Sequence, residues 1–473
     1  MEQRTVPEAW LRSLWHRRCF DSYPLFTTDG RPVAIHRTGI PNGDAGPDFL
    51  DALLRIGHTM YRGDVEIHVS ATDWEIHRHG TDPHYNRVVL HAALSPPRQE
   101  ARTASGRIIP LLLLPPLHEL PDPPELPRAI PFPGLPPLHC AEATRPAPST
   151  LRHHLQRFGF LRMQRKMEEY DERFRELRVE FGSREDLDRR PWEQLLYEGM
   201  CEGLGYAKNR EPFLALARNV PIHLLQSYDL NDSRTMRAIL FGAAGLLPTR
   251  PGEFDRDTRI ELRALRSIWR KIRPQLPIPI LHEGEWRFFR LRPVNFPTAR
   301  LAAWSTLLPR LFGAGGMEAI FARLAGPGLS IADRHRRLRE LLTAPVSGYW
   351  SRHYRFDDDL SPCGAAIGRA RANDMIVNAL IPAGLLRTRI FRQRKGEQIV
   401  HLLYRTLPPL QQNRFLALLQ RDLLRGGVPL ATAALQQGGL ELYRTRCRDG
   451  RCGECPVRPA GERQNVIPTL IGR

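Results

Sequence analysis

Three side chains that could hold a metal ion lie close together near the N-terminus. Asp48 opens one apolar segment, and Glu66 follows eighteen residues later, two positions before His68 in the segment GDVEIHVS. Successive side chains of a strand alternate between its two faces, so Asp64, Glu66 and His68 are expected on one face. The residues between them are valine or isoleucine and can enter a core. A row of two acids and an imidazole is costly to bury without a partner, and a divalent cation is the usual one.

This pattern suits metal-dependent hydrolysis of a phosphodiester. Carboxylates hold a hard cation such as Mg²⁺ or Mn²⁺, the cation polarises the scissile phosphate, and a bound water becomes the nucleophile. We therefore predict Asp48, Glu66 and His68 as the catalytic residues. Asp64 is a further predicted metal ligand. Histidine can act as a ligand or as a general base near neutral pH.

Histidines are frequent in the segment that follows. Five fall within a short stretch, at His68, His77, His79, His84 and His91. His77 and His79 lie in HRHGTDPHYN, close to the expected end of the strand, and we predict that they complete the metal site. Each histidine alone is more simply explained as a surface or core imidazole. Five together favour at least one functional member.

The order of these residues resembles the PD-(D/E)xK nuclease core. There, a Pro-Asp pair on one strand is followed by an acid-x-lysine motif on the next, and here Pro47-Asp48 is followed by Glu66-Ile67-His68. The resemblance implies a mixed sheet of the restriction-endonuclease type, with metal ligands at Asp48 and Glu66. It departs from that core at His68, which stands in the place of the lysine.

A longer series of segments resembles an uncharacterised bacterial family known as a domain of unknown function. The segments include GPDF, GDVEIH, HRHGTDPHYN and VVLH, and they continue to QQGGLELY and the terminal cysteines. This resemblance covers nearly the whole chain and implies no activity.

Three cysteines near the C-terminus have the spacing of metal ligands. Cys447, Cys452 and Cys455 form the pattern C-x4-C-x2-C-P, and a CxxC pair can bring both sulfurs to one ion. The pattern also resembles part of the iron–sulfur loop of helix-hairpin-helix DNA glycosylases, in which a fourth cysteine follows. None follows here, so a fourth ligand would be distant, such as Cys363 or His401. We predict a structural Zn²⁺ or iron–sulfur site, with reduced thiols as the alternative. The other cysteines are predicted to be ordinary thiols: Cys19, Cys140 and Cys201.

Positive charge is distributed unevenly along the chain. Its 69 Lys and Arg residues against 51 Asp and Glu residues give a net charge of +18. Residues 1–109 contain 13 Arg and 13 acidic residues and are therefore neutral. We expect the second half of the chain, rather than the acidic strand, to bind the phosphates of a nucleic acid. An Arg-rich solvated surface is the equally good alternative.

One segment of the second half, LRTRIFRQRKG, concentrates basic side chains around Phe391. Such a mixture suits phosphate contacts and base stacking, and a solvated helix end explains it equally well. The predicted nucleic-acid contacts are Arg387, Arg389, Arg392, Arg394 and Lys395.

Composition excludes several classes of protein. Apolar residues make up 42% of the chain and charged residues 25%, as in globular proteins. No apolar run approaches the length of about 18 residues that a membrane span needs, and the first residues contain no signal-peptide core. Seven cysteines, an odd number in a long chain, do not indicate a disulfide framework. We expect a cytoplasmic protein without a membrane partner.

The pattern of the chain predicts an α+β protein in which a mixed-sheet α/β domain is followed by a large all-α domain. Strand signals with a period of two dominate from position 25 to 94, after one short helix at 7–20. They include a hairpin with its turn at Gly57-His58. A segment with 13 prolines in residues 110–148 predicts a linker over 110–150. Apolar spacings of three and four then predict helices throughout 151–473, among them one over 364–381, and the first domain is placed at 1–109.

These observations favour a metal-dependent nuclease. Two other readings stay open. One is a non-catalytic nucleic-acid-binding or scaffold protein with a decayed nuclease core. The other is a metal hydrolase that acts on small molecules through the histidine cluster.

Overall fold

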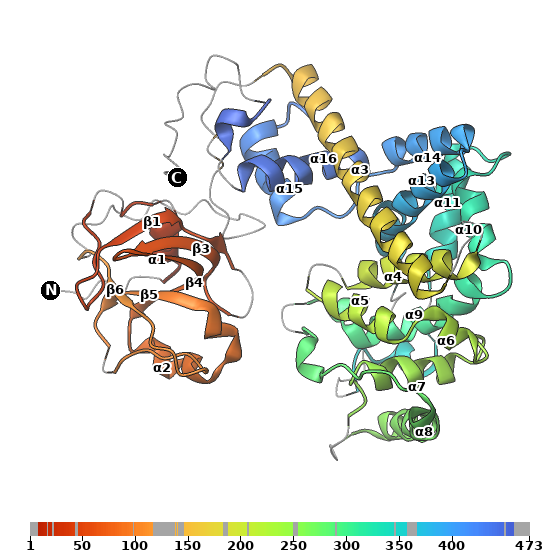
Figure 1. The fold of residues 1–473 in the computed structure, drawn as a ribbon, viewed down its shortest axis with the longest axis horizontal. Coiled ribbons are helices and arrows are strands. Elements are labelled where there is room, and N and C mark those ends of the chain that lie inside the picture. Colours follow the sequence, from red (N-terminus) through yellow and green to blue (C-terminus); the bar gives the residue numbers. More distant parts are fainter. Residues whose placement is uncertain are drawn as a thin grey trace. The chain divides into compact units, whose positions relative to one another are not determined.

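The structure is a computed structural model, and its chain divides into two compact units, Met1–Leu138 and His139–Arg473. Both units are drawn in Figure 1. The residues that the structure describes are 8–16, 18–20, 23–42, 46–97, 99–116, 138, 140, 146–182, 188–205, 208–248, 254–288, 291–344, 347–356, 367–448 and 451–457.

The N-terminal unit is built on a mixed sheet of six strands. This confirms the mixed-sheet domain that the predicted α+β class places first in the chain. The strand order is β1-β3-β4-β5-β6, with β2 paired to β3. The antiparallel pairs involve β1, β2, β3 and β4, and the parallel pairs are β4–β5 and β5–β6. The elements are α1 (Glu8–His16), β1 (Val33–Arg37), β2 (Ile40–Pro41), β3 (Phe49–Ile56), β4 (Thr59–Ser70), α2 (Asp73–Ile76), η1 (His79–Thr81), η2 (Pro83–Arg87), β5 (Val88–Ser95) and β6 (Leu111–Leu113).

The hairpin of β3 and β4 carries the predicted site, and its turn has the predicted place. Ile56 pairs with Thr59, so only Gly57 and His58 connect the strands. Gly57 has a φ of +61°, a conformation that glycine adopts without steric cost. The alternation along β4 also holds, because Val65 and Ile67 enter a core that α1 covers.

Gly63 of β4 allows β5 to approach closely. A Cβ atom at this position would lie 2.6 Å from the carbonyl oxygen of Arg87 and 2.3 Å from Cγ1 of Val89. The Val89 side chain can rotate, but the backbone oxygen cannot move without disturbing the strand pair that holds Glu66 and His68.

Gly63→Ala is therefore expected to destabilise the N-terminal unit by about 2 kcal/mol, in the range of overpacked positions. Thermal unfolding of the full chain measures this effect. Met60→Ala is the control, because Met60 lies on the same strand, is 49% exposed and should change stability by less than about 0.5 kcal/mol. Equal stability of the two variants would contradict the close approach.

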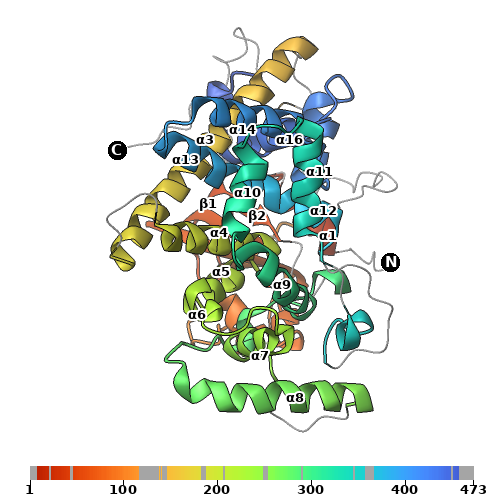
Figure 2. The ribbon, with the colours of Figure 1, turned by 90° about the vertical axis from the view of Figure 1, so that its right-hand side faces the viewer.

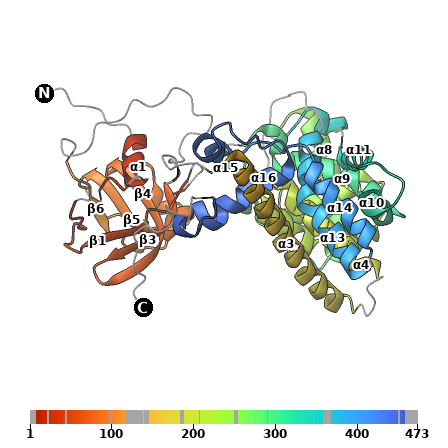
Figure 3. The same ribbon diagram turned by 90° about the horizontal axis from the view of Figure 1, so that it is seen from above.

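The C-terminal unit is helical, as predicted. Its elements are α3 (Pro148–Glu180), α4 (Arg189–Leu204), α5 (Arg210–Asn219), α6 (Ile222–Gln226), α7 (Ser233–Ala243), α8 (Arg256–Ile272), η4 (Arg273–Gln275), η5 (Glu283–Glu285), η6 (Pro293–Asn295), α9 (Pro297–Phe312), α10 (Gly316–Ala325), α11 (Ile331–Leu342), η7 (Gly348–Ser351), α12 (Arg369–Met375), η8 (Ile376–Leu380), α13 (Ile381–Ile390), α14 (Arg394–Thr406), α15 (Arg414–Leu419), η9 (Gln420–Leu424), α16 (Ala433–Leu442), η10 (Tyr443–Cys447) and η11 (Cys452–Glu454). Figure 2 shows α8 beside α7 at one end of this unit, and Figure 3 shows α16 lying along α3.

Two elements of the structure begin inside the segment predicted as a linker over 110–150. Leu111–Leu113 form β6 at the edge of the sheet, and α3 begins at Pro148. Much of the remaining proline-rich segment lies outside the described residues.

The helix predicted to end at Ile381, before Pro382, instead continues to Ile390. A π turn over Ile376–Leu380 makes this continuation feasible. Pro382 has no N–H for the carbonyl of Asn378, four residues earlier, and the Tyr170 hydroxyl donates to that carbonyl at 3.5 Å.

No helix in the described part of the chain combines the length and the apolar character that crossing a membrane requires.

Candidate metal site

Asp48 and Glu66 tie β3 and β4 together at the centre of the predicted site. The backbone N–H of Asp48 donates to Glu66 Oε2 at 2.8 Å, and the backbone N–H of Ile67 donates to Asp48 Oδ2 at 3.1 Å. Both side chains are buried. Each carboxylate thus binds the backbone at the other residue's strand through one of its two oxygens. The second oxygen of each carboxylate is left for other partners.

The remaining oxygen of Asp48 binds Arg12 of α1, whose Nη1 lies 2.6 Å from Oδ1. Burial and the neighbouring Glu66 carboxylate raise the pKa of Asp48, although Arg12 opposes this rise. No pattern in the sequence indicates Arg12, because it lies on another element, 36 positions earlier. Asp48 is therefore oriented toward Arg12 and the β4 backbone.

The remaining oxygen of Glu66 faces two imidazoles. Oε1 lies 3.3 Å from Nε2 of His68 and 3.4 Å from Nε2 of His79. Burial alone would raise the pKa of Glu66, but the two histidines outweigh this effect and lower it. The same carboxylate raises the pKa of His68 against the opposing effect of burial.

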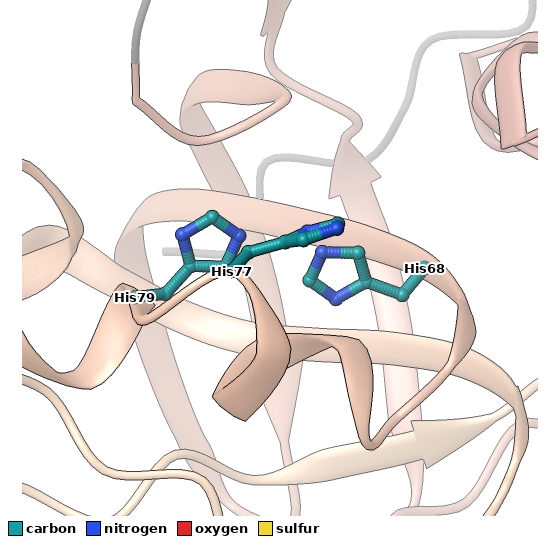
Figure 4. Close-up of side chains that lie close together, drawn as sticks. All are labelled: His68, His77 and His79. Atoms are coloured by element: carbon teal, nitrogen blue, oxygen red, sulfur yellow. The ribbon is translucent and has the colours of Figure 1, made fainter.

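His77 joins His68 and His79 in one cluster. One nitrogen of each imidazole lies within 4.8 Å of the others, and the described residues contain no second group of three such donors at this spacing. Figure 4 shows the three side chains gathered together. His68 comes from β4, His77 follows α2 and His79 begins η1. The short connection from β4 to β5 thus folds back to the end of β4, as the sequence predicted for these histidines.

The spacing of the donors fits a bound cation. Two ligands at 2.0–2.1 Å from a tetrahedral ion are separated by about 3.4 Å, which is the separation of Glu66 Oε1 from both imidazole nitrogens. His79 Nε2 is also buried without a hydrogen bond from the described residues. A metal ion would satisfy this atom. His68 and His79 are buried whereas His77 is exposed, so the cluster is accessible from the side of His77.

His91 of β5 supports His68 from behind. Its Nε2 lies 2.9 Å from Nδ1 of His68. Burial, and then the charge of His68, lower the pKa of His91 to about 3, so His91 is neutral and can accept the Nδ1 proton of His68. That arrangement leaves the Nε2 lone pair of His68 for a ligand bond, as in many histidine metal sites.

Aromatic side chains hold His79 in place. The ring of Tyr85 stacks on His79 at 3.8 Å between centroids, and Trp74 meets His79 edge-on at 5.3 Å. The Trp74 indole is itself fixed, because Nε1 donates to the carbonyl of Arg102 at 3.1 Å. Packing on two sides limits the rotation of the imidazole.

Other sequence candidates in this unit have different partners. Asp64, a predicted ligand, is buried and accepts a hydrogen bond from the backbone N–H of Asp51 at 2.9 Å. It contributes no atom to the histidine cluster. The exposed His84 pairs with Asp82 at 2.6 Å, and Asp82 caps η2 by accepting a hydrogen bond from the backbone N–H of His84.

The basic segment of the helical unit is partly used internally. Arg387 lies over the rings of Phe321 and Phe391, at 4.5 and 4.9 Å from their centroids. Arg389 pairs with Glu397 at 2.7 Å. The exposed cationic side chains of the segment are Arg389, Arg392, Arg394 and Lys395, which stay predicted nucleic-acid contacts.

The C-terminal cysteines lie at the end of the helical unit. Cys447 ends η10, and Cys452 begins η11, after which Cys455 follows. None of the cysteines in the described residues forms a disulfide. Of the distant ligands suggested by the sequence, Cys363 lies outside the described residues, and His401 contacts Glu397 at 3.8 Å instead.

The fold and the site thus define an α+β protein whose sheet unit holds a cluster of three histidines. Residues 8–413 match the model of a family described as a protein of unknown function, DUF2851. The chain belongs to this family, as its sequence segments predicted. No curated protein and no solved structure gives a significant match to the chain.

Proposed function

We propose that the N-terminal unit is a divalent-metal-dependent phosphodiesterase that acts on nucleic acid. The observation that carries this proposal is the position of Glu66 Oε1, which lies 3.3 and 3.4 Å from two imidazole nitrogens. A buried carboxylate and imidazoles at ligand spacing, open on the side of His77, suit a catalytic ion that needs a free position.

The imidazole donors change the choice of ion from the Mg²⁺ or Mn²⁺ that the carboxylates alone suggested. Imidazole suits Zn²⁺ and Fe²⁺, whereas carboxylate oxygens suit Mg²⁺ and Mn²⁺, so a site with both kinds of donor suits Zn²⁺ or Mn²⁺. We therefore propose Zn²⁺ or Mn²⁺ with Glu66, His68 and His79 as its ligands and His77 at the open side. When bound, such an ion would polarise a phosphate and lower the pKa of a bound water.

Asp48 has a positioning role in this proposal. Its backbone N–H holds Glu66 Oε2, and its carboxylate holds the β4 backbone and Arg12. The Arg12–Asp48 pair also keeps a cationic group beside the ligands, where it can attract a phosphate.

The topology of the N-terminal unit supports the choice of a phosphodiester. A helix is followed by a hairpin that carries Pro47-Asp48 and Glu66-Ile67-His68, and then by a short helical connection and the parallel strand β5. This order is similar to the PD-(D/E)xK core. The positive charge downstream of residue 109 would bind the substrate backbone in a cytoplasmic setting.

The test is cleavage of labelled single- and double-stranded DNA and RNA by the full chain, stripped of metal and then given Zn²⁺, Mn²⁺ or Mg²⁺. Glu66→Gln and His79→Ala are each expected to lower the rate by at least about 100-fold. His84→Ala is the matched control, because it removes an exposed imidazole of the same connection. Cleavage that survives in Glu66→Gln would refute the proposed site.

The histidine cluster itself supports a second candidate, a metal hydrolase of small molecules, because three imidazoles gather where the nuclease core has one lysine. Metal-dependent hydrolysis of small phosphate or carboxylate esters, without cleavage of any nucleic acid, would favour it. Binding of nucleic acid without any hydrolysis would favour the other alternative, a non-catalytic nucleic-acid-binding protein whose nuclease-like core has lost its activity.

A further inference from the structure

The solvent side of α8 carries a row of arginines. They follow one another at intervals of three, four and seven residues, which a helix with 3.6 residues per turn places on one face. The row extends over about 21 Å, because each residue advances the helix by about 1.5 Å. All its side chains are exposed. The arginine row consists of Arg256, Arg259, Arg263 and Arg270.

The opposite face of α8 holds the helix in place. Leu262 and Leu265 are buried in the core of the helical unit, at 2% and 0% exposure. The helix that α8 packs against is α7 (Figure 2). The arginine row therefore lies on a fixed helix rather than on a loop.

The acidic side chains of the segment do not neutralise the arginine row. Glu261 is buried on the opposite face, where it accepts a hydrogen bond from Nε1 of Trp350 at 3.3 Å. Asp255 caps the helix and lies 3.2 Å from Nε2 of His353. Asp257 is exposed, but it lies on the flank of the helix. Within the described part of the chain, no arginine of the row takes part in an ion pair.

Exposed arginines on two other helices have acidic partners. Arg175 pairs with Asp171, four residues earlier, and Arg336 pairs with Asp333 at 2.7 Å. In the arginine row, by contrast, the neighbour four residues after Arg259 is another arginine. Like charges at this spacing destabilise a helix. The row is thus a local cost to α8, and a bound polyanion would remove it.

We propose that the arginine row of α8 binds the phosphate backbone of a nucleic acid. The inference rests on the proposed function, because it gives the substrate a binding surface on the helical unit. Guanidinium groups in line on a helix suit phosphates, which repeat along a strand. The helix contains no Asn or Gln, the side chains that read adenine. Binding is therefore expected to depend on the backbone and not on the base sequence.

The same face of α8 is poorly suited to a membrane surface. A helix that lies in a lipid interface needs a face of apolar side chains that enter the lipid. The structure describes every residue of α8, and Ile260 is its one exposed large apolar side chain. Charge without such a face favours a nucleic acid over an anionic membrane.

The test is binding of the full chain to labelled DNA duplexes of two unrelated base sequences and to single-stranded RNA. Divalent metal is left out, so no metal-dependent cleavage occurs. The triple variant Arg259→Gln/Arg263→Gln/Arg270→Gln is expected to bind at least about tenfold more weakly. Its plot of log affinity against log salt should be less steep by about 2 to 3, since each lost phosphate contact removes about 0.9. Glutamine resembles arginine in helix propensity and removes the repulsion, so the variant should unfold at the wild-type temperature or above it.

The matched control is Arg175→Gln/Arg210→Gln/Arg336→Gln. It removes the same charge from exposed arginines that pair with acids, and it should bind nearly as wild type does. The inference is overturned if wild type binds no nucleic acid, if the α8 variant keeps the wild-type affinity and salt dependence, or if the control loses as much. Binding through α8 only to phosphatidylserine vesicles would overturn it as well.

This readout is independent of the proposed catalytic activity. If the full chain cleaves no nucleic acid with any metal, the α8 variant can still show the loss of binding, and then the phosphodiesterase alone is refuted. If wild type cleaves nucleic acid and the α8 variant binds as wild type does, the surface on α8 alone is refuted.

Discussion

Glu66→Gln is expected to weaken divalent-metal binding at the histidine cluster by at least about 100-fold, or about 2.8 kcal/mol, without unfolding the N-terminal unit. Oε1 is the atom that lies between His68 and His79. Glutamine removes its charge and can place an amide N–H₂ there, which cannot bind a cation. Its remaining oxygen can still accept the N–H of Asp48, as Oε2 does now, so the strand pair is retained.

Calorimetric titration of the metal-free full chain with Mn²⁺ measures this effect, because thiolates prefer softer ions and the cysteines then contribute little. Thermal unfolding gives a second readout: saturating Mn²⁺ should raise the unfolding temperature of wild type but not of Glu66→Gln. Glu75→Gln is the matched control, since Glu75 is an exposed carboxylate on α2. Equal Mn²⁺ affinity in wild type and Glu66→Gln would show that Glu66 is not a ligand.

The sequence predicted the hairpin of β3 and β4 well because its signals are local. Alternating apolar residues and a Gly57-His58 turn determine which side chains share a face, and the structure keeps that alternation. The longer course of α13 could not be predicted, because it depends on Tyr170 of a distant helix satisfying the Asn378 carbonyl. Propensity rules treat Pro382 as a helix end and do not include such a partner.

The same difference between local sequence signals and contacts with distant segments applies to the candidate sites. Residue types indicated Glu66, His68, His77 and His79, and the fold brings their donors together. Spacing along one strand also suggested Asp64, whose carboxylate the β3 backbone occupies instead. Contacts between distant segments leave no pattern in a single sequence.

The packing of α3 against α16 depends on two glycines that face each other. A Cβ atom at Gly438 would lie 1.9 Å from the carbonyl oxygen of Leu155, and a Cβ atom at Gly159 would lie 2.5 Å from that of Ala434. These contacts are with backbone atoms, which no change of rotamer can relieve. Gly159 is further fixed because its carbonyl accepts the hydroxyl of Tyr404 at 2.9 Å.

Gly438→Ala is therefore expected to force the two helices apart and to destabilise the helical unit by about 3 kcal/mol or more. The unfolding temperature of this unit in the full chain, followed by circular dichroism, should fall by more than about 5 °C. Gly384→Ala is the matched control: Gly384 is a buried glycine of α13, but an added Cβ would meet its nearest neighbour, Leu324, at 3.4 Å. Because alanine favours a helix by up to about 1 kcal/mol over glycine, Gly384→Ala should be neutral or stabilising. If both variants had the stability of wild type, α3 and α16 would be packed less closely than their backbones indicate.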